Sequence, residues 1–303
     1  MKKSSSNHFD VIIIGGSYAG LSAAMALGRS LRKVLILDSG NPCNAQTPHS
    51  HNFITQDGKK PAEISRLALE QVLKYDTVKL IKEQAIKSEK TDSGFDISTG
   101  SEEFSAKKII LATGIRDILP GIIGLKECWG ISVIHCPYCH GYEFRHRKTG
   151  IMANGDRAFH IAGLVKNLTD DLMVFTNGEP EFSEEQFNKL TENNIPVIED
   201  PVSEIIHQSG NLSEIILSNG ISFPMDALYA SLPFQQHSDI AAQLDCELTE
   251  TGHIRVDGFQ KTNIDGVFAC GDNASPMRSV ANAVYAGSVA GAMVNHQLVQ
   301  EAF

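Results

Sequence analysis

The fold is decided near the start of the chain, by His8-Phe9-Asp10-Val11-Ile12-Ile13-Ile14 followed by Gly15-Gly16-Ser17-Tyr18-Ala19-Gly20. The first stretch is an apolar run rich in β-branched residues, as in a parallel strand buried on both faces. The glycines then permit a tight turn, and an apolar pattern of helical period runs from Leu21 to Ser30. The chain is therefore predicted to open with a strand, a glycine-rich turn and a helix.

A second strand and an acidic residue complete this unit. The run from Lys33 to Leu37 is again buried in character, and Asp38 follows it, 18 positions after Gly20. In dinucleotide-binding folds the glycines let the backbone approach a pyrophosphate at the helix N-terminus, and the acid accepts hydrogen bonds from ribose hydroxyls. Ser17 stands where a middle glycine is usual, and serine is the next smallest residue that keeps the turn possible. The alternative, a turn without a ligand, is disfavoured by the complete strand-helix-strand context.

Two later segments extend the same predicted site. A buried strand from Lys108 to Ala112 ends at Thr113-Gly114, and another from Gly266 to Cys270 ends at Gly271-Asp272. A helix of small residues, from about Ser279 to Asn295, comes next, and its N-terminus is suited to an anionic flavin edge. The order of these elements is that of a flavoprotein whose FAD domain is split around an insertion.

The middle of the chain repeats the plan of the first part with altered chemistry. A strand at residues 149–152, a turn, a helix to about residue 168 and a strand at residues 172–175 are followed by a hairpin and a closing strand at residues 227–230. Ala153 replaces the first fingerprint glycine, and Thr176 stands where Asp38 stands in the first copy. Neither the acid that holds an NADH ribose nor arginines for the NADPH phosphate are found there. This domain is either a structural remnant or a weak nicotinamide site.

The stretch Cys136-Pro137-Tyr138-Cys139 carries the most chemistry, because two thiols at this spacing can form an easily exchanged disulfide. A zinc site would need a second pair of soft ligands, and the other four cysteines are scattered singly. The His49-Ser50-His51 pattern likewise has no third ligand at a suitable spacing. We therefore predict a redox centre and no metal site.

Composition limits the remaining possibilities. The chain has 303 residues, of which 42% are hydrophobic, which is enough for two ordinary domains. Its net charge of −10 and the absence of a long basic run argue against nucleic-acid binding. The apolar run at residues 11–14 is too short for a signal-peptide core or a membrane span. We expect a soluble, cytoplasmic protein, in which a CxxC pair is more often catalytic than structural.

Taken together, the elements from Val11 to about Asn295 resemble the low-molecular-weight thioredoxin reductase family of FAD-dependent pyridine nucleotide-disulfide oxidoreductases. The CxxC pair lies just before the second fingerprint and after Gly130-Ile131-Ser132-Val133, as in that family. The resemblance implies an α/β fold of two Rossmann-like, three-layer ββα dinucleotide-binding domains, the second inserted in the first. Residues 1–116 and 233–303 would form the FAD domain, and residues 117–232 the NAD(P)H-binding-like domain. A homodimer is also implied.

Site residues follow from the fingerprints and from this resemblance. By resemblance Cys139 faces the flavin, Cys136 exchanges with substrate, and the residue after the pair, His140, takes part in proton transfer. The predicted FAD-binding residues are Gly15, Ser17, Gly20, Asp38, Asn52, Thr113, Gly114, Gly271, Asp272, Arg278, Ser279 and Val280. Use of NAD(P)H stays uncertain.

One departure from the family bears on direction. Thioredoxin reductases usually carry an acid after the second cysteine, whereas this chain has His140, as in a related branch of small-molecule dithiol oxidases. Imidazole titrates near neutrality and is expected to take a proton from a substrate thiol, while a helix N-terminus after Cys136 is a second candidate for activating a thiol. The favoured prediction is a flavoprotein that exchanges electrons between FAD and a dithiol or disulfide, small or thioredoxin-like, with weak or no NADPH use. The alternatives are an NADPH-dependent thioredoxin reductase and a non-catalytic FAD-bound redox sensor.

Overall fold

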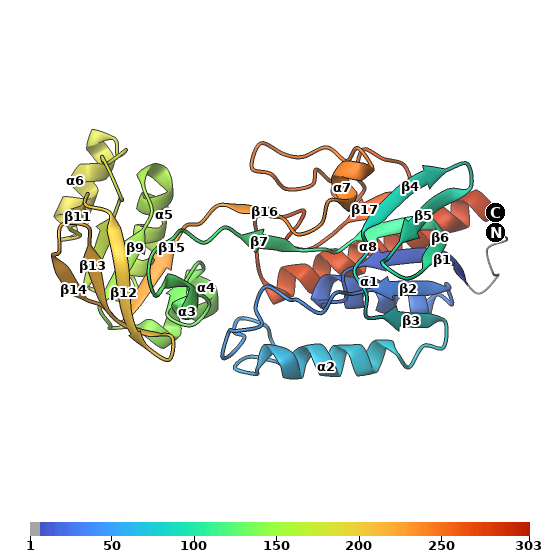
Figure 1. Ribbon diagram of the computed structural model, residues 1–303, viewed down its shortest axis with the longest axis horizontal. Helices are drawn as coiled ribbons and strands as arrows, with labels where there is room; N and C mark the ends of the chain where they lie inside the picture. The colour runs from blue at the N-terminus through green and yellow to red at the C-terminus, as the bar shows by residue number, and fades with distance from the viewer. Residues whose placement is uncertain (1–6) are drawn as a thin grey trace. The chain divides into compact units, whose positions relative to one another are not determined.

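The computed structural model describes residues 7–303 and separates into two compact units, whose elements are labelled in Figure 1. The first unit combines the described part of Met1–Ala45 with Pro61–Arg116 and Phe234–Phe303. The second consists of Gln46–Lys60 and Asp117–Pro233. The second unit is thus an insertion in the first, and the α/β class predicted from the sequence is confirmed.

The first unit is built on a seven-stranded sheet in the order β3-β2-β1-β6-β5-β4, with β17 also paired to β6. Strands β3, β2, β1, β6 and β17 run parallel, and β5 and β4 continue the sheet antiparallel. In this register Ile14 lies beside both Leu37 and Leu111, so three strands end at the same edge. The strands are β1 (His8–Ile14), β2 (Val34–Leu37), β3 (Val78–Ile81), β4 (Lys87–Thr91), β5 (Gly94–Ser98), β6 (Glu103–Leu111) and β17 (Val267–Ala269).

Two long helices of this unit pack closely against each other. A Cβ on Gly287 of α8 (Val280–Ala302) would lie 2.1 Å from the carbonyl oxygen of Ala19 in α1 (Tyr18–Arg29). The Ser22 hydroxyl donates to the carbonyl of Val284 across the same contact, at 2.7 Å. Glycine and small residues in α8 therefore bring it directly onto α1. The other elements of the unit are α2 (Pro61–Val72), α7 (Ile240–Gln243), and the two-stranded pair β7 (Ile115–Asp117) and β16 (Phe234–Gln236).

The second unit has a five-stranded sheet, β11-β10-β9-β15-β8, whose paired strands all run parallel, and a separate antiparallel sheet, β12-β13-β14. Its strands are β8 (Val133–Ile134), β9 (Thr149–Met152), β10 (Leu172–Phe175), β11 (Val197–Ile198), β12 (Val202–Gln208), β13 (Asn211–Leu217), β14 (Ser222–Pro224) and β15 (Ala227–Ala230). Its helices are α3 (Leu125–Cys128), α4 (Pro137–His140), the 3₁₀ turn Tyr142–Phe144, α5 (Gly155–Lys166) and α6 (Glu184–Glu192). The predicted repeat of the strand-helix-strand plan is present as β9, α5 and β10.

Two expectations about segment boundaries differ from the structure. The hairpin and closing strand of the first unit merge, because β6 pairs with β5 at its start and with β1 along most of its length. The predicted domain bounds place residues 46–60 in the first domain, whereas this segment packs with the second unit. The reason is close contact: a Cβ on Gly130 would meet Gln46 and Thr47 at 3.1–3.2 Å, and His51 faces Glu143.

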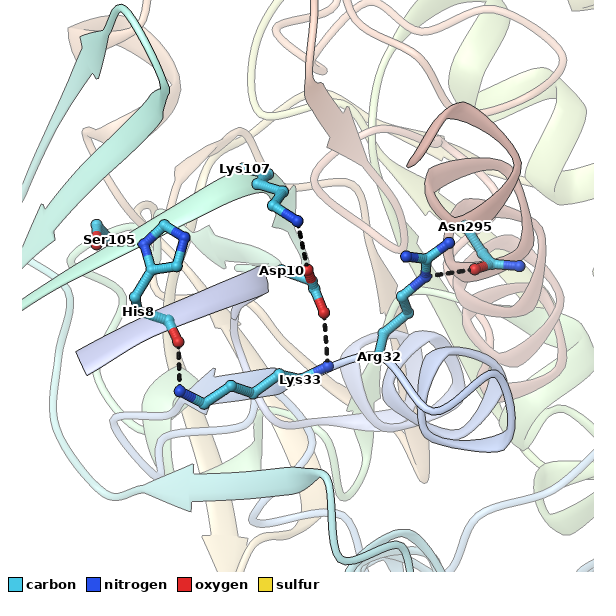
Figure 2. Close-up of polar contacts among 7 residues, drawn as sticks. All are labelled: His8, Asp10, Arg32, Lys33, Ser105, Lys107 and Asn295. Carbon is cyan, nitrogen blue, oxygen red and sulfur yellow. Dashed lines mark hydrogen bonds and ion pairs between the residues drawn. The ribbon is translucent and has the colours of Figure 1, made fainter. Parts of the chain in front are cut away.

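A partly buried carboxylate, Asp10 in β1, links the start of β2 to the middle of β6 (Figure 2). The Asp10 carboxylate accepts a hydrogen bond from the backbone N–H of Lys33 at 3.0 Å and one from Lys107 Nζ at 2.9 Å. Beside it, Arg32 Nε donates to Asn295 Oδ1 of α8 at 2.7 Å. Burial raises the pKa of the Asp10 carboxyl, but the Lys33 hydrogen bond and the Lys107 cation outweigh it and hold that pKa below its ordinary value.

Replacing Asp10 by Asn should destabilise the protein at neutral pH by about 1–2 kcal/mol, since a hydrogen-bonded charge is lost. Because the pKa of Asp10 is lowered on folding, its stabilisation is present above the unfolded pKa and fades as pH falls through the folded value. Urea unfolding should therefore show a higher free energy of unfolding for wild type than for Asp10→Asn at pH 7, and a smaller difference between the two at pH 3. Glu89→Gln, which removes the exposed Lys87–Glu89 pair, is the control and should change little at either pH.

Candidate cofactor and redox sites

The turn after β1 can be made only with glycine at two positions. Gly15 has a φ of +107°, and a Cβ there would lie 2.1 Å from the carbonyl oxygen of Ala112. A Cβ on Gly20 would lie 1.9 Å from the carbonyl oxygen of Gly15. Ser17, by contrast, is extended, with a φ of −88°, so a side chain is accommodated there without strain. The departure from the usual middle glycine is explained by this backbone conformation.

The N-terminus of α1 is open to an anion. Ser17 is its N-cap residue but its side chain makes no capping hydrogen bond, and the first turn holds no acidic residue. The first backbone N–H groups of a helix have no intrahelical partner and carry a partial positive charge. Asp38, at the end of β2, accepts a hydrogen bond from the backbone N–H of Gly16 at 3.1 Å. The glycine turn and the Asp38 carboxylate are thus adjacent.

The remaining predicted residues of the first unit gather after neighbouring strands. Thr113 and Gly114 follow β6, and Gly271 and Asp272 follow β17, which pairs with it. The sequence analysis missed Asn273, which is fully buried and donates to the carbonyl of Leu111 at 2.9 Å and to Thr113 Oγ1 at 3.3 Å. Asn273 ties the two loops together, and a lone Asn after a Gly-Asp pair carries no signal that would have revealed it.

The last helix begins next to these loops. Arg278 is mostly buried, and its Nε lies 3.9 Å from Asp272 Oδ2. Ser279 caps α8 by accepting a hydrogen bond from the backbone N–H of Asn282 at 3.1 Å, and Val280 is the first helical residue. Asn52 belongs to the other unit, where its backbone N–H donates to Asp57 Oδ1 at 2.8 Å.

The second fingerprint forms a pocket whose helix terminus is already capped. Asn154 Oδ1 accepts hydrogen bonds from the backbone N–H groups of Gly155 at 2.8 Å and Glu181 at 2.9 Å. Asp156 lies in the first turn of α5, and the Glu181 side chain lies beside Gly155. These carboxylates oppose an anion where a pyrophosphate would bind in this fold. The pocket, about 440 Å³, is lined by Ile118, Pro120, Ile122, Met152, Ala153, Asn154, Thr176, Asn177, Ser231, Leu232 and Pro233.

Polar side chains in this pocket are engaged by the protein itself. Thr176 donates to the carbonyl of Gly178 at 2.6 Å, and Asn177 Oδ1 accepts from the backbone N–H of Val202 at 2.9 Å. Thr176 has no carboxylate with which to bind a ribose, and its hydroxyl is already engaged by the protein. The pocket keeps the shape of a nucleotide site without its charged selectivity groups.

The cysteine pair lies on a short helix at the end of β8. Cys136 is the N-cap residue of α4 and Cys139 is inside it, and both are half-buried. Because α4 spans only four residues, it has little macrodipole to stabilise a thiolate. The helix N-terminus proposed from the sequence is therefore a weak source of thiol activation. Tyr138, between the cysteines, is 67% exposed and marks the open side of the helix.

The surroundings of the His140 ring differ from those expected from the sequence. Both of its ring nitrogens are buried without a hydrogen-bond partner in the described residues. Burial, and secondarily the charge of His51, lower the pKa of His140 from 6.5 to about 4. The prediction that this imidazole titrates near neutrality is wrong, because the ring is desolvated. At pH 7 it is a neutral imidazole whose nitrogens are unsatisfied.

The other cysteines are inert or lie apart from this pair. Burial raises the pKa of the Cys128 and Cys246 thiols, and raises that of Cys270 to about 12. Cys43 is exposed, and its Sγ lies 3.9 Å from Asp272 Oδ2. Among the described residues no group of three or more potential ligands could hold a metal ion. None of the helices described between residues 7 and 303 is long and apolar enough to span a bilayer.

Comparison with known proteins decides the family. The model of the pyridine nucleotide-disulphide oxidoreductases matches residues 9–287. The chain belongs to this family. It is 33% identical to the thioredoxin reductase tcpT of Claviceps purpurea over 98% of this chain and 97% of that protein.

Solved structures agree with the assignment. A putative thioredoxin reductase TrxB from Bacillus anthracis superposes with a TM-score of 0.91 at 30% identity, covering 97% of this chain and all of that one. An oxidoreductase from Agrobacterium tumefaciens gives 0.89 at 37% identity, covering 96% and 99%. The protein is a thioredoxin-reductase-like, FAD-dependent disulfide oxidoreductase with two dinucleotide-binding Rossmann folds.

Protonation of His140 should make the oxidoreductase sensitive to mild acid. A histidine whose pKa is lowered on folding takes up its proton more readily in the unfolded chain, so stability falls between about pH 6.5 and pH 4. The loss between pH 7 and pH 5 should be about 2 kcal/mol. Urea unfolding at these two pH values should show this loss of free energy of unfolding in wild type and in the control His49→Gln. The loss should be absent in His140→Gln. Equal pH dependence in His140→Gln would contradict the lowered pKa.

Proposed function

We propose that the protein exchanges electrons between FAD and a substrate dithiol or disulfide through Cys136 and Cys139, with little or no use of NADPH. The observation that carries this proposal is the contrast between two helix termini of one chain. The α1 terminus has no side-chain cap and no acid in its first turn, whereas the α5 terminus is capped by Asn154 and flanked by Asp156. The first suits a bound pyrophosphate and the second disfavours one.

The first unit has the residues to hold FAD. The space that a Cβ would fill at Gly15 and Gly20 is taken by backbone, so the turn stays tight next to the first N–H groups of α1. Asp38 is placed for ribose hydroxyls, and Asp272, Arg278, Ser279 and Val280 lie at or near the start of α8 in the same unit. When bound, FAD supplies a two-electron acceptor for the dithiol form of the cysteine pair.

The exchange itself needs only thiolate chemistry. A substrate thiolate attacks Cys136 Sγ, the Cys136–Cys139 bond breaks, and its electron pair leaves with Cys139. The second substrate thiolate then attacks the substrate sulfur of this mixed disulfide and expels Cys136. In sum the substrate dithiol loses two electrons and two protons and becomes a disulfide, and the cysteine pair gains both electrons. Cys136 takes up one proton and Cys139 stays a thiolate, so the other proton must go to a different group. The reverse sequence reduces a disulfide substrate.

His140 is suited to receive one of these protons. In water a base with a pKa of about 4 would be a poor acceptor from a thiol, but both ring nitrogens of His140 are buried and unsatisfied. A thiolate and an imidazolium formed side by side in such a place attract each other more strongly than in water. This attraction offsets part of the cost of burying the imidazolium, so the proton transfer costs less when a substrate sulfur lies beside the ring than when it does not. This coupling favours formation of a disulfide over release of a free thiolate.

A second function is an NADPH-dependent thioredoxin reductase. The observation in its favour is that two relatives are named thioredoxin reductase. They come from Claviceps purpurea and Leptosphaeria maculans and are 33% and 31% identical over nearly the whole chain. In this case the second pocket would accept NADPH despite the capped α5, and a thioredoxin-like protein would be the partner of Cys136. A non-catalytic redox sensor would keep FAD but turn over with neither reagent.

Anaerobic mixing of the oxidised holoprotein with dithiothreitol, NADPH and NADH in turn separates these functions. We expect dithiothreitol to bleach the visible flavin absorbance quickly and the nicotinamides to bleach it slowly or not at all. In Cys139→Ser the rate of flavin bleaching by dithiothreitol should fall at least about 100-fold, because no second thiol remains to pass electrons to the flavin. Cys43→Ser is the matched control and should keep the wild-type rate. Fast bleaching by NADPH would instead support the reductase, and no bleaching by any reagent the sensor.

The role of Asp38 can be measured without turnover. Asp38→Asn removes a charged acceptor for ribose hydroxyls and should weaken FAD binding about 10- to 100-fold, in line with the loss of one or two charged hydrogen bonds. Fluorescence titration of the apoprotein with FAD gives the Kd. Asp92→Asn, the same change at an exposed hairpin position, should leave the Kd unchanged. Equal affinities for Asp38→Asn and wild type would place the ribose elsewhere.

A further inference from the structure

His51 stands between the redox helix and two carboxylates. Its side chain is 20% exposed, with Nδ1 3.6 Å from Asp57 Oδ1 and Nε2 3.5 Å from Glu143 Oε1. Its charge acts on the imidazole of His140. Residues 46–60 and the segment from Cys136 to Glu143 belong to the same compact unit. The loop therefore brings a second imidazole to Glu143, in the turn that follows the redox helix.

Exposure increases stepwise from His140 outward. The ring nitrogens of His140 have essentially no contact with solvent. The side chain of His51 is 20% exposed, that of Glu143 38%, and that of Asp57 67%. The exposed fraction thus rises from His51 through Glu143 to Asp57, next to an imidazole whose nitrogens are shielded from solvent.

We propose that His51 relays protons between His140 and solvent, with Glu143 and Asp57 as the outer acceptors. The proposal rests on the proposed thiol-disulfide exchange, in which His140 takes a proton from the substrate thiol. A buried base must lose that proton before the next thiol arrives, and its nitrogens have no direct access to water. His51 is a relay residue, since it acts on His140 and not on the substrate.

The proton balance shows what passes along this path. Each substrate dithiol that becomes a disulfide gives up two protons and two electrons. The electrons go to the cysteine pair, and one proton goes to His140 Nδ1 or Nε2. In the described residues His140 is not hydrogen-bonded to His51, so transfer between the rings uses a bridging water or a rotation of the His51 ring. His51 then gives a proton to the Glu143 carboxylate, which returns it to bulk water.

His51 is not needed to hold the loop in place. Its distances to Asp57 and Glu143 exceed ordinary hydrogen-bond lengths. Other groups hold the loop: His49 Nδ1 lies 2.9 Å from the carbonyl oxygen of Gly58, and Ser50 and Lys59 form a backbone bridge. A ring with loose polar contacts on both sides can change its protonation and orientation at little structural expense.

The charged and titratable groups around this pair come from several elements. The loop contributes His49, whose ring centroid is 6.4 Å from that of His51, and Asp57. The redox segment contributes Glu143 and Cys136, and β15 contributes the buried phenol of Tyr229, which is affected by the charges of Cys136 and Glu143. Burial raises the pKa of Tyr229, so it stays protonated and does not compete as a base.

The test compares His51→Gln with His49→Gln in the holoprotein. Anaerobic flavin bleaching by dithiothreitol should slow by about 100-fold in His51→Gln, the usual size of a lost proton-transfer group, and by less than about twofold in His49→Gln. Added imidazole should restore much of the rate in His51→Gln and none in wild type. A slow variant that imidazole does not rescue, or a variant as fast as wild type, would overturn the relay.

Two further measurements make the outcome independent of folding defects and of the proposed function. Glu143→Gln should slow bleaching less than His51→Gln, because Asp57 remains, and should also respond to imidazole. In His51→Gln the NMR titration of His140 should move to higher pH than in wild type, since a neighbouring positive charge is lost. An unmoved titration would overturn the coupling of the two rings. If dithiothreitol fails to bleach wild type, the proposed function itself fails, which is a different result.

Discussion

The first turn of an α-helix has backbone N–H groups that no residue of the helix can satisfy, and this constraint governs both units of the molecule. In α1 the chain leaves those groups without a side-chain cap, next to a glycine turn that backbone contacts keep tight. In α5 the chain supplies Asn154, and the loop carrying Glu181 folds over the same place. One fold repeated in one chain therefore has one helix terminus without a side-chain cap and one that the protein caps itself.

The redox segment follows a second constraint, which is the desolvation of a titratable ring. Burial makes His140 a weak base until a thiolate lies beside it, so its usefulness depends on the substrate being present. The same burial cuts the ring off from water, and the loop at residues 46–60 becomes relevant for that reason. The segment packs with the second unit, where its His51 is partly exposed and faces two carboxylates.

Local patterns predicted the first unit well. The strand at His8–Ile14, the glycine turn and the helix follow from hydrophobic period and glycine placement, which depend on neighbouring residues only. The helix α8 begins where expected but continues to Ala302 and not to about Asn295, because Glu301 pairs with the nearly buried Lys108. That contact joins residues 193 positions apart, and no window of sequence contains both.

The chemistry of the two sites was less predictable than the fold, because it depends on contacts between residues that are far apart in the sequence. The changes at Ala153 and Thr176 were visible in the sequence, but the capping of α5 depends on a loop that returns 27 residues later. The identity of His140 was visible, whereas its lowered pKa depends on the burial of its ring nitrogens, which no motif records. Likewise His51 drew notice only as half of a metal-like HxH pattern. Its place between Asp57 and Glu143 is a tertiary fact.

The capping of α5 also limits what a single change in the second pocket could achieve. An acidic residue at Thr176 would restore a ribose acceptor, but the pyrophosphate would still meet Asn154, which already satisfies the N–H of Gly155. Asp156 and Glu181 would still place negative charge beside the phosphates. Removing Asp156 would in turn release the side chain of Gln186 from its partner, and removing Asn154 would release the backbone N–H of Glu181. The proposed entry of electrons from a thiol therefore rests on several linked contacts, and not on the absence of one selectivity residue.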